Sequence, residues 1–233
     1  MKLARQDLDS FLTLFPREFP DLTDTEQQVS QHLYRLLAEG QPVSHTQLAE
    51  TANVSSPVVE AILHQWPGVY KNEAGHIIGY WGLALPEMDH RFEVGGRGLF
   101  TWCAWDSLFI PAILQTSAQV HSTCPVTGYA IRLTVSPQGV EVLEPAEAVM
   151  SFVLPDASQV RQDVIQHFCH YVYFFRSEEV GTQWISEHPG TLLLSIQEAF
   201  ELGRRKNAMQ YKELLGSHSE DDACCGTHGG RQE

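Results

Sequence analysis

Residues 98–111 form an almost wholly apolar run that carries one thiol, Cys103, and one carboxylate, Asp106, three positions apart. On a helix, side chains three positions apart lie on one face, with their Cβ atoms about 5–6 Å from each other. An ionisable pair in an apolar run carries a desolvation cost, so a carboxylate buried there needs partners or a shifted pKa. The run therefore predicts a buried helix around which the chain is organised, and Cys103 and Asp106 are its candidate functional residues.

Each of these residues also has a purely structural interpretation. A lone buried cysteine commonly packs as a small hydrophobe, and Asp106 could complement the helix dipole in the first turn. We expect Cys103 just inside the start of the helix, where the dipole would lower its thiol pKa from the usual value of about 8.5. Spacing alone leaves the structural and the functional interpretations open.

Composition restricts the classes of protein that this chain can belong to. With 233 residues, of which 43% are hydrophobic, it can bury the core of one large domain or two small ones. No apolar run reaches the roughly 18–20 residues of a membrane span, and residues 1–7 are too polar for a signal peptide, so we predict a cytoplasmic protein without a membrane partner. The net charge of -14 disfavours nucleic acid. Five cysteines without zinc-like spacing predict reduced thiols.

The N-terminal part has the pattern of a winged-helix-like module that follows an arm of mixed acidic and aromatic residues. Thr25 is expected to cap the first helix, Ser44 the second, and Pro57 to lie in the first turn of the third. A hairpin is expected over residues 69–80. The candidate recognition helix, residues 55–65, contains no Lys or Arg, so this pattern favours packing rather than DNA binding.

The rest of the chain predicts an α+β fold, in which a mixed or antiparallel sheet with flanking helices follows the N-terminal module. The glycine-rich residues 95–98 indicate a tight turn between a strand and the Cys103 helix. The predicted domains are residues 1–85, 86–216 and a polar disordered tail, 217–233. Strands are predicted at 87–94, 130–135, 140–143, 149–154 and 170–175, and helices at 155–168 and 191–215.

Residues 102–111, Trp-Cys-Ala-Trp-Asp-Ser-Leu-Phe-Ile-Pro, resemble the Trp-Cys-Ala-x-Asp-x-Leu-x-x-Pro signature of the organomercurial (alkylmercury) lyases. Residues 121–128, 133–137 and 168–175 match further stretches of that family in the same order. The resemblance implies an enzyme of mercury detoxification that cleaves carbon–mercury bonds by protonolysis to Hg(II) and a hydrocarbon. It implies no resident cofactor, small cellular thiols that release the Hg(II), and hand-off of the metal to a mercuric reductase.

The resemblance also implies roles for three residues. Cys103 would take up the organomercury cation, Asp106 would accept the proton of a second thiol and pass it to carbon, and Cys169 would complete a dithiolate around Hg(II). Without the resemblance, Cys169 reads as a core residue. We expect Cys124 to be structural, and Trp102 and Trp105 to pack and exclude water.

Two departures from the family pattern bear on rate and substrate range. Phe100 stands where the family often has Tyr, and His170 follows Cys169 where some relatives have a second Cys. Neither departure removes a member of the predicted triad.

Two other hypotheses concern different chemistry, and a third concerns release of Hg(II) by the lyase. One is a thiol-based mercury or metal sensor that binds DNA through the winged helix, for which a basic recognition helix is missing. Another is a cysteine hydrolase, which needs a histidine base such as His121, His167 or His170. The adjacent Cys224 and Cys225 could act as a tethered acceptor of Hg(II), although the acidic residues 220–222 would raise their thiol pKa.

Overall fold

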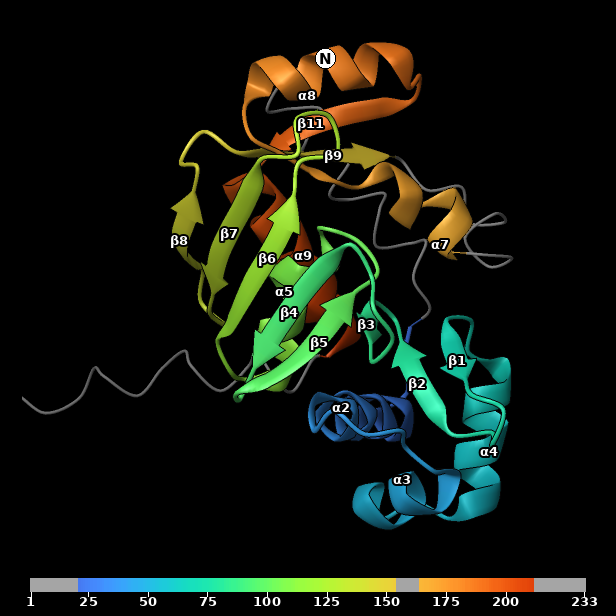
Figure 1. Cartoon of the computed structure of the whole chain (residues 1–233). Coiled ribbons are helices and arrows are strands. Elements are labelled where there is room, and N and C mark those ends of the chain that lie inside the picture. Colours follow the sequence, from blue (N-terminus) through green and yellow to red (C-terminus); the bar gives the residue numbers. More distant parts are fainter. Residues whose placement is uncertain (1–20, 154–163, 212–233) are drawn as a thin grey trace, which may run out of the picture.

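The computed structural model describes residues 21–153 and 164–211. The predicted arm up to residue 20, most of the predicted helix 155–168, and the tail with Cys224 and Cys225 lie outside the described residues. The fold is α+β, as predicted, with an antiparallel sheet of eight strands and a smaller sheet of three strands (Figure 1).

Three helices form the N-terminal part from residue 21 onward, and the first two of them begin at side-chain caps. Thr23, rather than the predicted Thr25, caps the first of them, because Thr23 stands three residues before Glu26 and the two side chains close a capping box. The Ser44 hydroxyl accepts a hydrogen bond from the Gln47 N–H at 3.1 Å, as expected for a cap. The helices are α2 (Asp24–Ala38), α3 (His45–Ala52) and α4 (Ser56–Gln65).

The predicted hairpin follows α4 and is formed by β1 (Val69–Lys71) and β2 (Ile77–Tyr80). Strand β2 pairs with β3 (Leu83–Ala84), so the hairpin forms one end of the eight-stranded sheet, in the order β1-β2-β3-β5-β4-β6-β7-β8. The sheet thus runs across residue 85. The division into domains at that residue, and the winged-helix identity of the first part, stay predictions.

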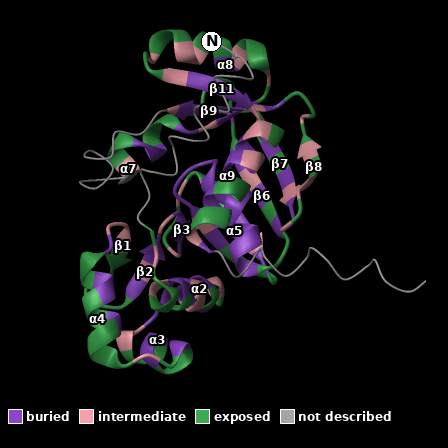
Figure 2. Cartoon of the chain, turned by 180° about the vertical axis from the view of Figure 1, so that it is seen from behind, coloured by how far each residue is buried: buried purple, intermediate pink, exposed green. Residues whose placement is uncertain are grey.

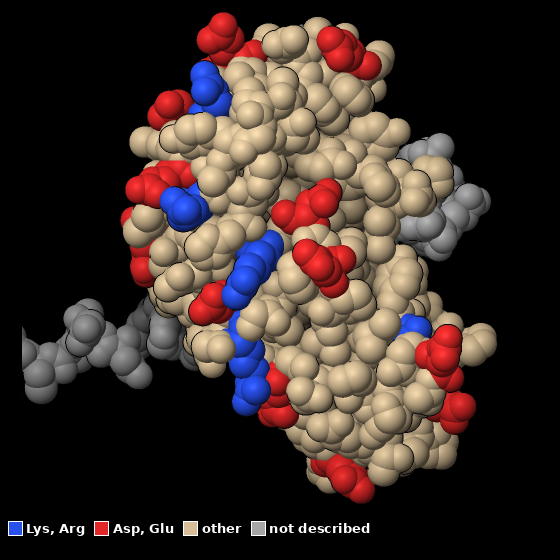
Figure 3. All heavy atoms as spheres, in the orientation of Figure 1, with Lys and Arg blue, Asp and Glu red and all other residues tan. Residues whose placement is uncertain are grey.

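The lack of nucleic-acid binding stays a prediction, and the surface of the described part carries the charges as follows. Helix α4 carries no Lys or Arg and exposes Glu60. Acidic side chains are spread over the face drawn in Figure 3, whereas basic ones gather mainly in one stripe. Within residues 21–153 and 164–211, the helices are too short or too polar to cross a membrane.

The centre of the large sheet contains the predicted glycine turn, but this turn leads into a second strand rather than directly into the Cys103 helix. Gly95 and Gly96 join β4 to β5 with φ angles of 57° and 74°, in the left-handed region that glycine adopts without strain. The predicted hairpin over 130–143 is also present, as the antiparallel pair β7 and β8. The strands are β4 (His90–Val94), β5 (Arg97–Thr101), β6 (Ala118–Thr123), β7 (Ala130–Val135) and β8 (Val140–Glu144).

The C-terminal part differs from the sequence prediction in three places. The predicted strand 170–175 is a strand only at its end, after a single 3₁₀ turn, η2 (Cys169–Tyr171). The predicted helix 191–215 begins with a strand of the small sheet, because residues 191–195 pair with residues 149–153. A further helix, α8, was not predicted. The elements are β9 (Val149–Val153), α7 (Val164–His167), β10 (Phe174–Phe175), α8 (Glu178–Glu187), β11 (Thr191–Ser195) and α9 (Ile196–Gln210).

Helix α5 (Asp106–Leu114) lies at the core, and every residue in it is buried. It packs against α9, and both helices lie against the large sheet when the molecule is seen from behind (Figure 2). At Gly203 of α9 the two helices are so close that a Cβ atom would lie 2.6 Å from the Cβ of Phe109. The indole N–H of Trp105 donates to the carbonyl of Ala199 at 2.9 Å. These contacts fix the first turn of α5, where Asp106 lies.

Candidate functional site

The structure brings Cys103, Asp106 and Cys169 together, with one ligand atom from each lying within 4.8 Å of those of the other two. All three side chains are buried. Cys103 lies in the turn between β5 and α5, Asp106 is the first residue of α5, and Cys169 opens the 3₁₀ turn η2. Two soft thiols and one carboxylate therefore face one another in a dry environment, which is a donor set suited to a soft metal such as mercury.

Cys103 and Asp106 meet through a turn and not, as the spacing predicted, along one helix face. The N–H of Cys103 donates to Oδ2 of Asp106 at 3.0 Å, and the Thr101 hydroxyl donates to the Cys103 carbonyl at 3.0 Å. The N–H of Ala104 donates to the carbonyl of Val172 at 3.2 Å, which ties this turn to the segment that carries Cys169. The turn is thus held at both ends, and the thiol is fixed beside the carboxylate.

The expected lowering of the Cys103 pKa by the helix dipole is wrong. Burial raises the pKa of the Cys103 thiol well above its usual range, and a hydrogen bond with Cys169 and the charge of Asp106 raise it further. Desolvation and a neighbouring negative charge both disfavour a thiolate. The resting thiol is therefore protonated and needs a base before it can bind a metal.

Asp106 is suited to be that base. Burial raises its pKa to about 6, while hydrogen bonds from Cys103 and the charge of Lys206 oppose the rise. A carboxyl group with this pKa can take and return a proton near neutral pH. Lys206 is buried, with its Nζ 3.9 Å from the centre of the Phe109 ring, and burial lowers its pKa to about 7.

Sequence reasoning missed Lys206 and Gly82. The spacing of Ala199, Gly203 and Lys206 on α9 places the lysine on the apolar face, and this periodicity could have identified it. Gly82 has a φ of +100°, and a Cβ atom there would lie 2.5 Å from Cγ of Asp106. The backbone at Gly82 therefore forms a wall against which the Asp106 carboxylate rests.

A cavity of about 200 Å³ leads from the surface to Cys169. Neither Cys103 nor Asp106 lines it, so Cys169 is the thiol of the cluster at its wall. Trp102 is nearly buried in the same wall, as expected for a side chain that excludes water. The lining is Glu87, Met88, Asp89, Trp102, Ile165, Cys169, His170 and Tyr173.

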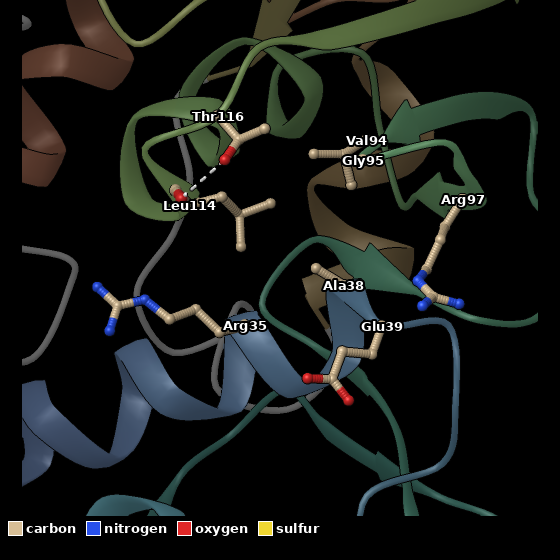
Figure 4. Close-up of a pocket in the computed structure, with 8 residues that line it drawn as sticks. All are labelled: Arg35, Ala38, Glu39, Val94, Gly95, Arg97, Leu114 and Thr116. Carbon is tan, nitrogen blue, oxygen red and sulfur yellow. Dashed lines mark hydrogen bonds between the residues drawn. The ribbon is translucent and has the colours of Figure 1, made fainter.

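A second cavity, of about 240 Å³, lies between the end of α2, the β4–β5 turn and the end of α5. Figure 4 shows the guanidinium groups of Arg35 and Arg97 on opposite sides of it. None of the predicted site residues lines this cavity, and its charged groups do not converge on one point. We therefore assign the chemistry to the cluster at Cys169.

Trp105 and His170 are neighbours of the cluster but not members of it. Trp105 is a packing residue, with its ring 4.8 Å from Phe109 and 5.3 Å from Phe152. His170 lines the mouth of the cavity and is exposed, whereas the neighbours that raise the pKa of Cys103 are Cys169 and Asp106 rather than an imidazole. This arrangement does not favour the cysteine hydrolase hypothesis.

Cys124 is buried in the turn after β6 and is not part of the cluster. Burial raises the pKa of its thiol, but hydrogen bonds from Thr127, Arg176 and Val126 lower it by more, so the sulfur is tied to the turn.

We expect Cys124→Ser to lose about 1–2 kcal/mol of unfolding free energy, because it buries a more polar atom, and to keep the chemistry. Urea unfolding and the cleavage rate test this, and a folded but inactive Cys124→Ser protein would contradict it.

Comparisons with known proteins identify the family. A family model described as alkylmercury lyase matches residues 83–207, which include the whole cluster. The chain is 43% identical to an alkylmercury lyase of Pseudomonas putida over 188 residues, which are 81% of this chain and 84% of that protein. It is 41% identical to an alkylmercury lyase of Streptomyces lividans over 193 residues, 83% of this chain and 86% of that protein. A crystal structure of the mercury-bound form of MerB2 has the same fold, with a TM-score of 0.69 and 22% identity over 88% of this chain and 100% of that one.

Proposed function

This chain belongs to the alkylmercury lyase family and is an organomercurial lyase, and on that premise we propose that Cys103, Asp106 and Cys169 are the residues that cleave the carbon–mercury bond. The observation that carries the proposal is the meeting of two buried thiols and one carboxylate within 4.8 Å. Protonolysis needs electron density on the metal and a proton for the leaving carbon. Two thiolates supply the first, and a carboxylic acid supplies the second.

In the first step, the Cys103 thiol gives its proton to the Asp106 carboxylate, and the sulfur displaces the carrier group from the organomercurial. The departing carrier takes that proton, so Asp106 is a carboxylate again. In the second step, the Cys169 thiol gives its proton to Asp106 and its sulfur binds the metal. Asp106 then protonates the carbon, the hydrocarbon leaves, and Hg(II) remains between two thiolates.

The electrostatics of the site support the proton transfers to and from Asp106. Because burial raises the pKa of Cys103, its proton must be removed as the metal binds, and Asp106 is the adjacent acceptor. With a pKa of about 6, Asp106 is also acidic enough to protonate a carbanion-like leaving group. Burial keeps water from competing as the proton donor.

The proposed function is tested by counting products in a single turnover with phenylmercury. One benzene should be released for each phenylmercury consumed, and the Hg(II) should stay with the protein until a small thiol is added. Gas chromatography measures the benzene, and gel filtration with metal analysis measures the bound Hg(II). Release of benzene without retention of Hg(II) would contradict the dithiolate product.

The cleavage rate should fall as the pH drops through about 6, because Asp106 is then protonated and cannot accept the thiol proton. Lys206 has a pKa of about 7 and loses its charge as the pH rises, not as it falls. The decrease of the cleavage rate at low pH therefore reports the protonation of Asp106. Single-turnover rates between about pH 5 and about pH 8 measure the effect. Asp106→Asn is the control, since it should be slow at every pH. A wild-type rate that does not change across this range would rule out the assigned role.

Release of the product is the second half of the proposal. A buried dithiolate holds Hg(II) tightly, so small cellular thiols would remove it by exchange through the cavity at Cys169. A mercuric reductase would then receive the metal, and Cys224 and Cys225 would serve as a tethered acceptor. This chemistry uses no resident cofactor and requires reduced thiols, which supports a cytoplasmic location. The DNA-binding sensor is not favoured, since the described α4 carries neither Lys nor Arg.

A further inference from the structure

The cavity that leads to Cys169 has an acidic rim. Glu87 and Asp89 are exposed, while Met88 between them is half-buried. Of the eight described residues that line the cavity, none is Lys or Arg. Any molecule that passes along this described part of the lining to the thiols therefore meets two carboxylates.

Asp89 of the rim and the two thiols of the cluster act on the same cavity residue. Tyr173, which lines the same cavity, has a raised pKa because of burial first, then the charge of Asp89, and then the two thiols Cys103 and Cys169. The pKa of the Tyr173 phenol is therefore affected both by the rim and by the cluster. Charges this close interact more strongly across a partly dry cavity than they would in water.

The form in which mercury reaches the site makes the rim relevant. A soft organomercury cation in a thiol-containing solution is bound to a carrier thiol. In the exchange, a cysteine thiol of the enzyme forms the new sulfur–mercury bond, the bond to the carrier breaks, and the enzyme's proton ends on the carrier. The carrier sulfur must come within bonding distance of the metal, so the rest of a small carrier lies in the cavity or at its rim.

We propose that Glu87 and Asp89 make this lyase select its substrate by the charge of the carrier thiol, favouring cationic adducts and disfavouring anionic ones. The proposal rests on the proposed function, because it concerns the delivery of organomercury to Cys103 and Cys169. The organic group would contact the apolar part of the lining, which is formed by Trp102, Ile165 and Tyr173. The same rim would make anionic thiols slow to remove the product.

The test compares three phenylmercury adducts of similar size, made with cysteamine, 2-mercaptoethanol and 3-mercaptopropionate. Their carriers are cationic, neutral and anionic. At about pH 8, kcat/KM should fall in that order. We expect a ratio of about tenfold between the cationic and the anionic adduct at low ionic strength. High salt should shrink this ratio to about twofold.

The double variant Glu87→Gln/Asp89→Asn should bring the ratio to about twofold even at low salt. Its matched control is Glu50→Gln/Glu60→Gln, which removes the same charge from exposed positions on α3 and α4 and should keep the tenfold ratio. Cleavage of the neutral adduct reports the proposed function by itself. Equal rates for all three adducts, or an unchanged ratio in the rim variant, would overturn the selection by charge and leave the function intact.

Discussion

Replacing Cys103 with serine is expected to lower the single-turnover rate of carbon–mercury cleavage by at least about 1000-fold. The serine hydroxyl is a hard ligand that keeps its proton near neutral pH, so it neither captures the soft metal nor pushes electron density onto it. Cys169→Ser should be as slow in cleavage but should still bind phenylmercury through Cys103. Rapid-quench measurement of benzene, with metal analysis of the protein, separates capture from cleavage.

The matched control for both variants is Cys124→Ser, which changes the third buried cysteine of the described residues. It should cleave phenylmercury at close to the wild-type rate. Full activity in either Cys103→Ser or Cys169→Ser would remove that residue from the mechanism. Equal loss in all three variants would indicate that the buried thiols contribute to folding rather than to the reaction.

The sequence predicted the neighbourhood of Cys103 and Asp106 correctly but for the wrong geometric reason. Residues three apart meet at the start of a helix as well as along its face, because the Asp106 carboxylate accepts the N–H of Cys103. The place of Cys169 could not be derived from spacing, since 66 positions separate it from Cys103. From the sequence, only the family resemblance placed the two thiols in one site.

The direction of the pKa shift of Cys103 was predicted wrongly, because that direction depends on how the thiol is packed. A dipole argument uses only the local chain, whereas burial and the charge of Asp106 depend on the folded surroundings. The missed strand β11 has a different cause. Its apolar residues 192–194 continue smoothly into the helical pattern, although Ser195 and Glu198 form a capping box that marks the true start of α9. That signal was present in the sequence and could have placed the boundary.

Gly82→Ala should be the most damaging change outside the cluster. The backbone at Gly82 has a φ of +100°, and the new Cβ atom would lie 2.5 Å from Cγ of Asp106. No real contact is this short, so the buried carboxylate or the β2–β3 turn must move. We expect a loss of at least about 3 kcal/mol in unfolding free energy. Cleavage should slow by at least about 100-fold, because a shift of about 1 Å misplaces the proton acceptor.

Gly75→Ala separates the two causes of this effect. Gly75 also has a left-handed backbone, with a φ of +79°, but nothing lies within 4 Å of the Cβ position. Its substitution should therefore cost only the backbone strain, about 1 kcal/mol, and leave cleavage unchanged. Urea unfolding and single-turnover rates of both variants measure the difference. If Gly82→Ala were no less stable and no slower than Gly75→Ala, contact with Asp106 would not be the reason for a glycine at residue 82, and the carboxylate would have room to move during the reaction.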